Sequence, residues 1–198
     1  MRVALIGDSH SQVTFPLLRK ELEQGGHAVV YEQSKPGWGV KSYLKQGLPQ
    51  LAQAKPEKVV LSLGGNNQNL SASYGDEVKN LLGLLRQAGA KDVLWVGPLK
   101  SDPAVAPSTA RRHDWTRAWL QSNLGGLGAT FLDTYGVTDL VGSRDGVHLT
   151  RGKYQEMVAA LAGDVRSWVS ATFPWVWLAG GLSAAGLFIL LAVYLRGR

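Results

Sequence analysis

The sequence predicts an α/β fold: a three-layer α/β/α sandwich around a five-stranded parallel sheet, in the flavodoxin-like strand order 2-1-3-4-5. Five short apolar runs alternate with segments whose apolar residues recur at helical spacing. Such alternation implies βαβ crossovers, with helices on both faces of the sheet. At 198 residues, the chain is expected to form one domain with an appendage.

Each expected strand is an apolar run that stops at a glycine, a proline or a polar turn residue. The first is Val3-Ala-Leu-Ile6, which Gly7 ends. The five expected strands cover residues 3–6, 27–31, 58–63, 92–96 and 130–132.

Each expected helix presents one apolar face, as Val78, Leu81, Leu82 and Leu85 do within residues 74–87. Paired glycines end the helices that precede residues 25 and 125. The five expected helices cover residues 13–24, 43–54, 74–87, 109–124 and 151–169. Loops are expected over residues 34–39, 101–108 and 133–147.

Composition and charge exclude several classes of protein. The chain has no cysteine, which excludes disulfides, thiolate nucleophiles and cysteine-ligated zinc. The formal net charge is +6, but Arg196 and Arg198 contribute two of these charges at the end of the chain. A nucleic-acid interface needs a basic stripe interleaved with aromatic residues. None is apparent, so no nucleic-acid partner is expected. No cluster has the spacing of metal ligands, so no metal is expected.

An uncharged apolar run near the C-terminus predicts a membrane anchor. Residues 175–195 are long enough to cross a bilayer, for which about 20 apolar residues suffice. Trp175 and Trp177 stand at one end and Tyr194 at the other, as interfacial anchors do. The expected organisation is therefore a domain over residues 1–168, a junction over 169–174, the span, and a basic tail over 196–198.

The side of the membrane on which the domain lies is open. The first two residues run directly into a strand, so no cleavable signal peptide is expected and the domain would stay in the cytoplasm. The positive-inside rule instead favours Arg196 and Arg198 inside and the domain outside. Since a three-residue tail is a small barrier to translocation, the cytoplasmic side is favoured. Delivery as part of a phage particle into a host envelope is a third route.

Small residues in the span bear on its self-association. Gly180 and Ala184 lie four residues apart, as do Gly181 and Ala185. Such a stripe allows close helix–helix approach, and so a homo-oligomer through the span. Incidental small residues on a lipid-facing helix would give the same pattern.

Polar residues gather in four loops of the expected fold. Parallel strands end at one edge of the sheet, where open α/β sheets bind their ligands. We therefore expect these loops to meet. They are Gly7-Asp8-Ser9, the loop with Gly37 and Gly39, Gly64-Gly65-Asn66-Asn67, and Asp145-Gly146-Val147-His148.

These loops contain the residue types of nucleophilic catalysis. A serine hydroxyl is a weak nucleophile at neutral pH and needs a base within reach. An imidazole suits this task, best when a carboxylate fixes its tautomer. Asp145 lies three residues before His148 at a loop-to-helix junction, so their side chains can approach one another. The same loop can therefore supply Ser9 with a base and an orienting carboxylate.

Acyl transfer also needs donors for the oxyanion. The backbone N–H of Ser9 is one candidate. A second is the backbone N–H of Gly37, because glycine lets the chain approach a substrate closely. The third is the side-chain amide of Asn66, a neutral donor that leaves the titration of His148 undisturbed.

The four loops resemble, in the same order, the four sequence blocks of the SGNH (GDSL-type) hydrolase family. Each block alone is common by chance, but four in order, each at a strand end, are specific. The resemblance extends over residues 1–168. The matching blocks are Gly7-Asp8-Ser9, a loop glycine, Gly64-Gly65-Asn66 and Asp145-x-x-His148.

This resemblance implies roles for individual residues. Ser9 would be the nucleophile, His148 the base and Asp145 its partner. Ser9, Gly37 and Asn66 would form the oxyanion hole. Members of the family are esterases, lipases, thioesterases and carbohydrate O-acetylesterases, and they use no metal or organic cofactor.

The sequence departs from the family pattern in two places. Asn67 stands where the third block usually has aspartate, which removes a support of that loop rather than a catalytic group. In the second block both Gly37 and Gly39 are candidates, and Pro-Gly-Trp-Gly favours Gly37. Residues 7–11 approach the nucleophile elbow Gly-x-Ser-x-Gly but lack its second glycine. Because the triad acid also lies beside its histidine, an α/β-hydrolase fold is not expected.

The remaining histidines and tryptophans are assigned no catalytic role. His10 follows Ser9, but neighbours on a turn rarely face one another. His27 and His113 are expected to be structural or solvated. Trp38 is expected to form a wall of the substrate pocket, whereas packing is expected for Trp95, Trp115 and Trp119.

The sequence therefore predicts a membrane-anchored serine esterase that acts through an acyl-enzyme on a lipid, lipoprotein or envelope glycan ester. Transfer of the acyl group to an acceptor other than water is equally open, since the same triad serves both reactions. The alternative is a non-catalytic membrane or virion component that keeps the fold as an interaction module. Asn67 motivates that alternative, and the intact set of Ser9, Asp145 and His148 argues against it.

Overall fold

A computed structural model describes residues 1–66 and 73–171 of the chain. Its five strands are all parallel and form one sheet in the order β2-β1-β3-β4-β5, which confirms the predicted order. The strands are β1 (Arg2–Gly7), β2 (Ala28–Ser34), β3 (Lys58–Ser62), β4 (Asp92–Val96) and β5 (Thr130–Leu132).

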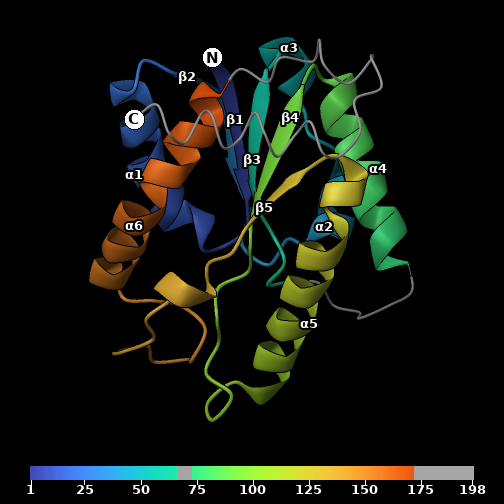
Figure 1. Ribbon diagram of the computed structural model, residues 1–198. Helices are drawn as coiled ribbons and strands as arrows, with labels where there is room; N and C mark the ends of the chain where they lie inside the picture. The colour runs from blue at the N-terminus through green and yellow to red at the C-terminus, as the bar shows by residue number, and fades with distance from the viewer. Residues whose placement is uncertain (67–72, 172–198) are drawn as a thin grey trace, which may run out of the picture.

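Helices cover both faces of the sheet, which makes the three predicted layers. Figure 1 shows α1 and α6 on one face and α2, α4 and α5 on the other. The α-helices are α1 (Ser11–Gln24), α2 (Val40–Gln46), α3 (Leu51–Ala54), α4 (Tyr74–Gln87), α5 (Pro107–Asn123) and α6 (Arg151–Ser170). Two single 3-10 turns, η1 (Gly125–Leu127) and η2 (Tyr135–Val137), flank β5.

Strand alternation divides the core into two halves. On β1, Val3 and Leu5 pack with α1 and α6, whereas Ala4 and Ile6 pack with α2 and α4. Successive side chains of a strand point to opposite faces, so a run buried on both faces must be apolar throughout. This explains why the strands read as continuous apolar runs.

The single helix expected over residues 43–54 is wrong. The structure divides this stretch into α2 and α3. Gly47 has φ +75° and ends α2, and Gln50 is also left-handed, with φ +64°. Pro49 lacks the N–H that a continuing helix would need. Local backbone chemistry thus outweighed the apolar spacing.

A buried lysine stabilises the end of α6. Lys58 is 2% exposed, and its Nζ donates hydrogen bonds of 2.7 Å to the carbonyls of both Trp168 and Ala171. The Asp92 carboxylate lies 3.5 Å away. Cationic side chains satisfy the carbonyls that the last turn of a helix leaves unpaired. The ammonium therefore joins the end of α6 to the start of β3.

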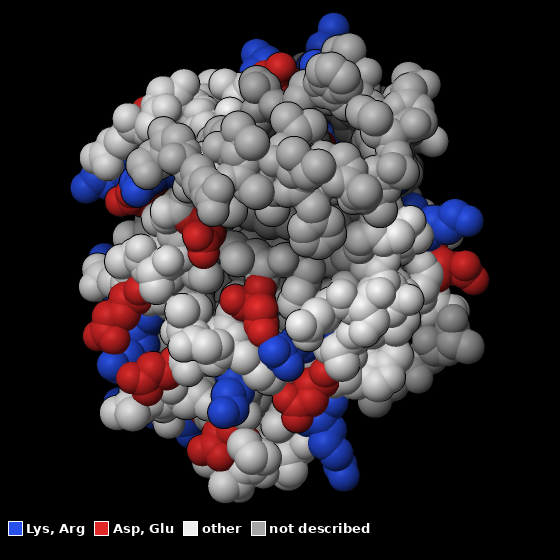
Figure 2. Space-filling view, viewed as in Figure 1, with Lys and Arg blue, Asp and Glu red and all other residues white. Residues whose placement is uncertain are grey.

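The predicted membrane span, residues 175–195, lies outside the described part of the chain. Within residues 1–66 and 73–171, no helix is long and apolar enough to cross a bilayer. On the face of the molecule seen in Figure 2, basic and acidic side chains are intermingled rather than gathered by sign.

Candidate active site

The turn from β1 into α1 positions Ser9 at the carboxyl edge of the sheet. The turn is tight, because α1 begins at Ser11, two residues after Ser9. A Cβ on Gly7 would lie 1.8 Å from the Ser11 Oγ, so only glycine fits where the strand ends. The half-buried Ser9 therefore projects at the point where the strands end, as open α/β sheets place their ligand sites.

Ser9, His148 and Asp145 form one hydrogen-bonded chain. The Ser9 Oγ lies 3.0 Å from His148 Nε2, and His148 Nδ1 lies 2.7 Å from Asp145 Oδ2. The two contacts occupy both ring nitrogens of His148. If Nδ1 carries the proton toward the carboxylate, Nε2 is left with a lone pair that faces the Ser9 hydroxyl. This is the arrangement that activates a serine.

The loop before α6 holds Asp145 in its charged form. Desolvation raises the pKa of Asp145, but hydrogen bonds from the His148 ring and from the backbone N–H groups of His148 and Val147 outweigh it. The pKa therefore lies well below its ordinary value. Gly146, with φ +66°, makes the turn that brings His148 back over Asp145. A carboxylate beside Nδ1 is thus present at neutral pH.

A cavity of about 190 Å³ lies beside the Ser9 hydroxyl. Its walls come from four loops or helices that are far apart in the sequence, and most of its lining is polar. The lining residues are Ser9, His10, Gly65, Asn66, Thr109, Arg112, His113, Asp145, Val147 and His148.

Of the three predicted oxyanion donors, the structure brings two to this cavity. Ser9 and Asn66 both line it. The Asn66 Nδ2 donates to the Trp38 carbonyl over a long 3.4 Å, which leaves the amide only weakly held. Gly37 is exposed, has φ +74°, and is not among the described residues that line the cavity. Gly39, the other candidate of the second block, is buried as the N-cap of α2.

The side chains of Arg112 and Asp8 contact the loop that carries Asn66, and no sequence motif predicts either contact. The Gly65 carbonyl accepts a 3.0 Å hydrogen bond from Arg112 Nε, and the Gly65 N–H donates to the Asp8 carboxylate. A Cβ on Gly65 would lie 3.1 Å from His113 Nε2 and 3.5 Å from Asp8 Oδ2. Gly65, which precedes Asn66, is therefore held by Arg112 on one side and lies beside Asp8 and His113 on the other.

Asp8 is a buried carboxyl next to the nucleophile. Only 3% of it is exposed, and burial raises its pKa to about 7, against the opposing hydrogen bonds from the His10 and Gly65 N–H groups and the nearby His148. Near neutral pH it is therefore partly protonated. Its hydrogen bonds to His10 and Gly65 connect the first block to the third.

His10, to which the sequence assigns no role, lies in this cavity with Ser9. Its ring lies 4.8 Å from the His148 ring, centroid to centroid. A turn does separate the side chains of neighbours, but it directs His10 toward a residue distant in the sequence. No local pattern signals this contact, because it depends on how α6 packs on α1.

His113 is structural and not solvated. It is 1% exposed, and its Nδ1 donates to the Leu99 carbonyl at 2.6 Å. Burial lowers its pKa, so the ring is neutral. His27, which precedes β2, is half-buried, with Nε2 3.2 Å from Ser170 Oγ.

Trp95, Trp115 and Trp119 pack as predicted, whereas Trp38 does not form the expected wall of this cavity. Trp95 is fully buried, and its Nε1 donates to the Leu63 carbonyl at 2.8 Å. Trp115 and Trp119 both contact the Tyr74 ring edge-on. Trp38 packs edge-on against Tyr43, and Trp38 is not among the described residues that line the cavity.

The described residues offer no arrangement for a metal ion. Within residues 1–66 and 73–171, no group of three or more histidine or carboxylate side chains is placed to hold one. His148 and Asp145 satisfy each other.

Solved structures with this fold are numerous, although their sequences are distant. A lipase/acylhydrolase from Enterococcus faecalis is 18% identical, with a TM-score of 0.68 over 84% of this chain and 96% of that one. TesA is 22% identical, with a TM-score of 0.68 over 84% of this chain and 99% of that one. The C-terminal catalytic domain of Streptococcus pneumoniae peptidoglycan O-acetyltransferase A is 18% identical, with a TM-score of 0.65 over 83% and 92%.

Comparison of sequences gives the family. No curated protein sequence matches the chain. The sequence profile of the GDSL-like lipase/acylhydrolase family, however, matches residues 5–164, which include all four sequence blocks. This range takes in Ser9 at one end of the domain and Asp145 and His148 at the other. The protein therefore belongs to the GDSL-like lipase/acylhydrolase family of SGNH hydrolases.

Proposed function

We propose that this protein is a membrane-anchored serine esterase that cleaves an ester through an acyl-enzyme. One observation carries the catalytic part of the proposal: the continuous contact from Ser9 Oγ through the His148 ring to the Asp145 carboxylate, at 3.0 and 2.7 Å. Membership of the family supports acyl chemistry. The uncharged run over residues 175–195 supports the anchor.

The reaction would proceed in two steps. Ser9 Oγ attacks the ester carbonyl carbon and passes its proton to His148 Nε2, while Asp145 stabilises the imidazolium. The Ser9 N–H and the Asn66 amide donate to the oxyanion, with a second-block N–H, for which Gly37 is the sequence candidate. The attack gives a tetrahedral intermediate. When it collapses, the carbon–oxygen bond to the alcohol breaks, and the alcohol takes the proton from His148. Water, activated by the same base, then releases the acid from Ser9.

The cavity favours a compact acyl group on a polar alcohol. At about 190 Å³ and with mostly polar walls, it suits an acetyl group or a sugar hydroxyl better than a long alkyl chain. The apolar cavity behind it, between α1, α6 and the sheet, has only about 30 Å³. That cavity is much smaller than the one beside the Ser9 hydroxyl and offers little room for a fatty chain. An O-acetylated envelope glycan is therefore the preferred substrate class.

Transfer to an acceptor other than water belongs to the same proposal. One of the similar solved structures is a peptidoglycan O-acetyltransferase domain, and the same triad can pass its acyl group to a sugar hydroxyl. Product analysis with an acetyl donor, with and without a glycan acceptor, separates the two reactions.

The test of the catalytic part is labelling of the detergent-solubilised chain with a fluorophosphonate, which a serine attacks only when it is activated. We expect labelling of the wild type and none of Ser9→Ala or His148→Ala. Circular dichroism should show that all three proteins are folded, so that a loss of labelling reports the loss of the activated serine. A folded wild type that stays unlabelled would overturn the esterase and leave the non-catalytic interaction module.

The test of the anchor is independent of activity. Membranes from cells that produce the full chain are washed with alkaline carbonate, which strips peripheral proteins. Retention of the chain in the pellet, and its loss when Phe188→Arg and Leu191→Arg introduce charges into the run, would support the span. Recovery of the wild type in the wash would overturn it.

A further inference from the structure

We propose that His10 is a positioning residue for the catalytic base: its imidazole, bound to Tyr154, packs against the His148 ring and keeps that ring aligned between Ser9 and Asp145. The inference deepens the proposed function and rests on it. His10 is 5% exposed, and its ring centroid is 4.8 Å from that of His148, with the planes inclined by 32°.

Both ring nitrogens of His148 are in hydrogen bonds, but those bonds alone leave the ring free to tilt about the line that joins its partners. Asp145 and His148 are both about half exposed, so water has access to them. His10, which is only 5% exposed, packs against the His148 ring and limits this tilt.

Tyr154 fixes His10 in turn. The Tyr154 hydroxyl lies 2.7 Å from His10 Nδ1. The phenol can donate to that nitrogen when the His10 proton resides on Nε2. Tyr154 thereby fixes the ring that packs against His148.

The charges around His10 suit this task. Burial lowers the pKa of His10 to about 3, helped by His148 and His113 and opposed by Asp145. The groups that act on its ring are His148 and Asp145 from the loop before α6, Tyr154 from α6 and His113 from α5. The Asp8 carboxylate accepts the backbone N–H of His10. Burial also raises the pKa of Tyr154 to about 12. A neutral ring and a neutral phenol place no positive charge beside His148 when it takes the serine proton.

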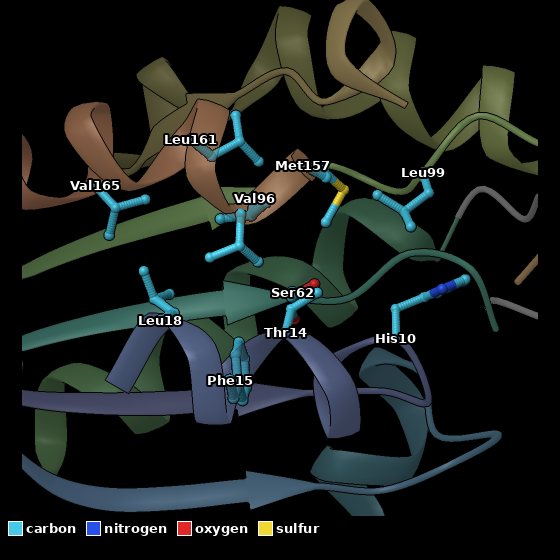
Figure 3. A pocket seen from close by; sticks show the side chains of 11 residues that line it. His10, Thr14, Phe15, Leu18, Ser62, Val96, Leu99, Met157, Leu161 and Val165 are labelled. Atoms are coloured by element: carbon cyan, nitrogen blue, oxygen red, sulfur yellow. The ribbon is translucent and has the colours of Figure 1, made fainter. Parts of the chain in front are cut away.

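Figure 3 separates His10 from the other residues of the apolar cavity. His10 stands at one end, and its ring points away from Leu18 and Val165, which lie toward the other end. The cavity therefore offers a matched control. Val165 belongs to the same cavity and is 1% exposed, but it lies far from the base along α6.

The experiment measures the rate at which a fluorophosphonate labels Ser9, since no substrate need be known. We expect His10→Ala to lower the limiting rate about 10- to 100-fold with little change in the probe concentration at half-saturation, because misplacement of a catalytic group slows the chemical step. His10→Phe keeps the packing but loses the bond to Tyr154, as does Tyr154→Phe. Both should lower the rate less, and the double variant no further than either single variant.

Val165→Ala should destabilise the fold and leave the labelling rate unchanged. Folded His10→Ala and Tyr154→Phe proteins that label at the wild-type rate would overturn the proposal. If His10→Ala fails to fold, the labelling rate of Tyr154→Phe, which lacks a single oxygen, tests the proposal. A rate equal to that of the wild type would overturn it.

Proton NMR distinguishes failure of this inference from failure of the proposed function. The proton shared by His148 Nδ1 and Asp145 should give a resolved downfield signal in the wild type and a broadened one in His10→Ala, whether or not any ester is cleaved. An unlabelled wild type with that pattern would overturn the esterase but keep the positioning role. An unchanged signal in His10→Ala would overturn the positioning role.

Discussion

The carboxylate of Asp145 holds His148 at two points. Its Oδ2 lies 2.7 Å from the ring Nδ1, and its Oδ1 accepts the backbone N–H of the same residue at 2.8 Å. One side chain therefore sets both the backbone position of the base and the tautomer of its ring. Asp145 can make both contacts because only two residues separate it from His148, and Gly146 turns the chain between them.

Asp145→Asn should lower the fluorophosphonate labelling rate by about 10²- to 10⁴-fold, the range that follows from a wrong tautomer. The amide oxygen can still accept the backbone N–H, but the amide nitrogen would donate to Nδ1 and leave the proton on Nε2, facing Ser9. Asp139→Asn is the matched control. Asp139 lies on the same loop as Asp145, but its carboxylate pairs with Lys153 of α6. A loss below threefold in Asp145→Asn would show that the carboxylate is dispensable.

Asn66→Ala should lower kcat for p-nitrophenyl acetate by about 10²- to 10³-fold with a small change in KM, because the amide acts mainly on the oxyanion of the transition state. The control is Asn123→Ala, which removes an amide that bonds the Trp119 carbonyl at the far end of α5. A fall in kcat/KM through KM alone would assign Asn66 to binding of the ground state instead.

Arg112→Lys should lower kcat about 10-fold through displacement of the Gly65–Asn66 loop. Arginine holds the Gly65 carbonyl through Nε and Thr109 Oγ1 through Nη2, at 3.0 and 3.2 Å, and an ammonium cannot reproduce this fork. Its exposed neighbour supplies the control, as Arg111→Lys should be silent. Equal activities of the two variants would contradict the prediction.

Asp8→Asn should become more stable, relative to the wild type, as the pH rises. The pKa of Asp8 is raised from about 3.8 unfolded to about 7 folded, so its contribution to stability is fully present below pH 3.8 and lost as the pH rises through 7. The difference in unfolding free energy between variant and wild type should therefore grow between these values. The slope has an upper limit of about 1.4 kcal/mol per pH unit.

Urea unfolding of both proteins at pH 4, 5.5, 7 and 8 measures this difference. The N–H groups of His10 and Gly65 favour the charged form of Asp8, so their contribution is already contained in its folded pKa. A difference that stays constant from pH 4 to 7 would mean that Asp8 titrates normally in the folded protein.

Much of the fold could be predicted because its signals are local. An apolar run of five residues, or apolar residues three and four apart, needs no knowledge of the rest of the chain. The prediction of a single helix over residues 43–54 was wrong for an equally local reason. The apolar spacing there is helical, but Gly47 and Pro49 impose backbone angles and a missing donor that end the helix.

The residues of the candidate site could be predicted because nucleophilic catalysis requires particular residue types at strand ends. Ser9, Asp145 and His148 were chosen on that basis, and the structure brings all three into contact. Gly37 was chosen in the same way and lies in an exposed part of its loop. A glycine carries no side chain to reveal which of two candidates points inward, so the pattern alone does not discriminate between Gly37 and Gly39.

The sequence by itself determined the class of fold, the order of the strands and the choice of Ser9, Asp145 and His148 as candidates, because each depends on residue type and spacing along the chain. Only the tertiary structure decided which side chains surround those three residues. Arg112 reaches Gly65 because α5 passes over the third loop, and His10 meets His148 because α1 and α6 pack side by side. Such contacts depend on helix packing, which leaves no periodic trace in the sequence.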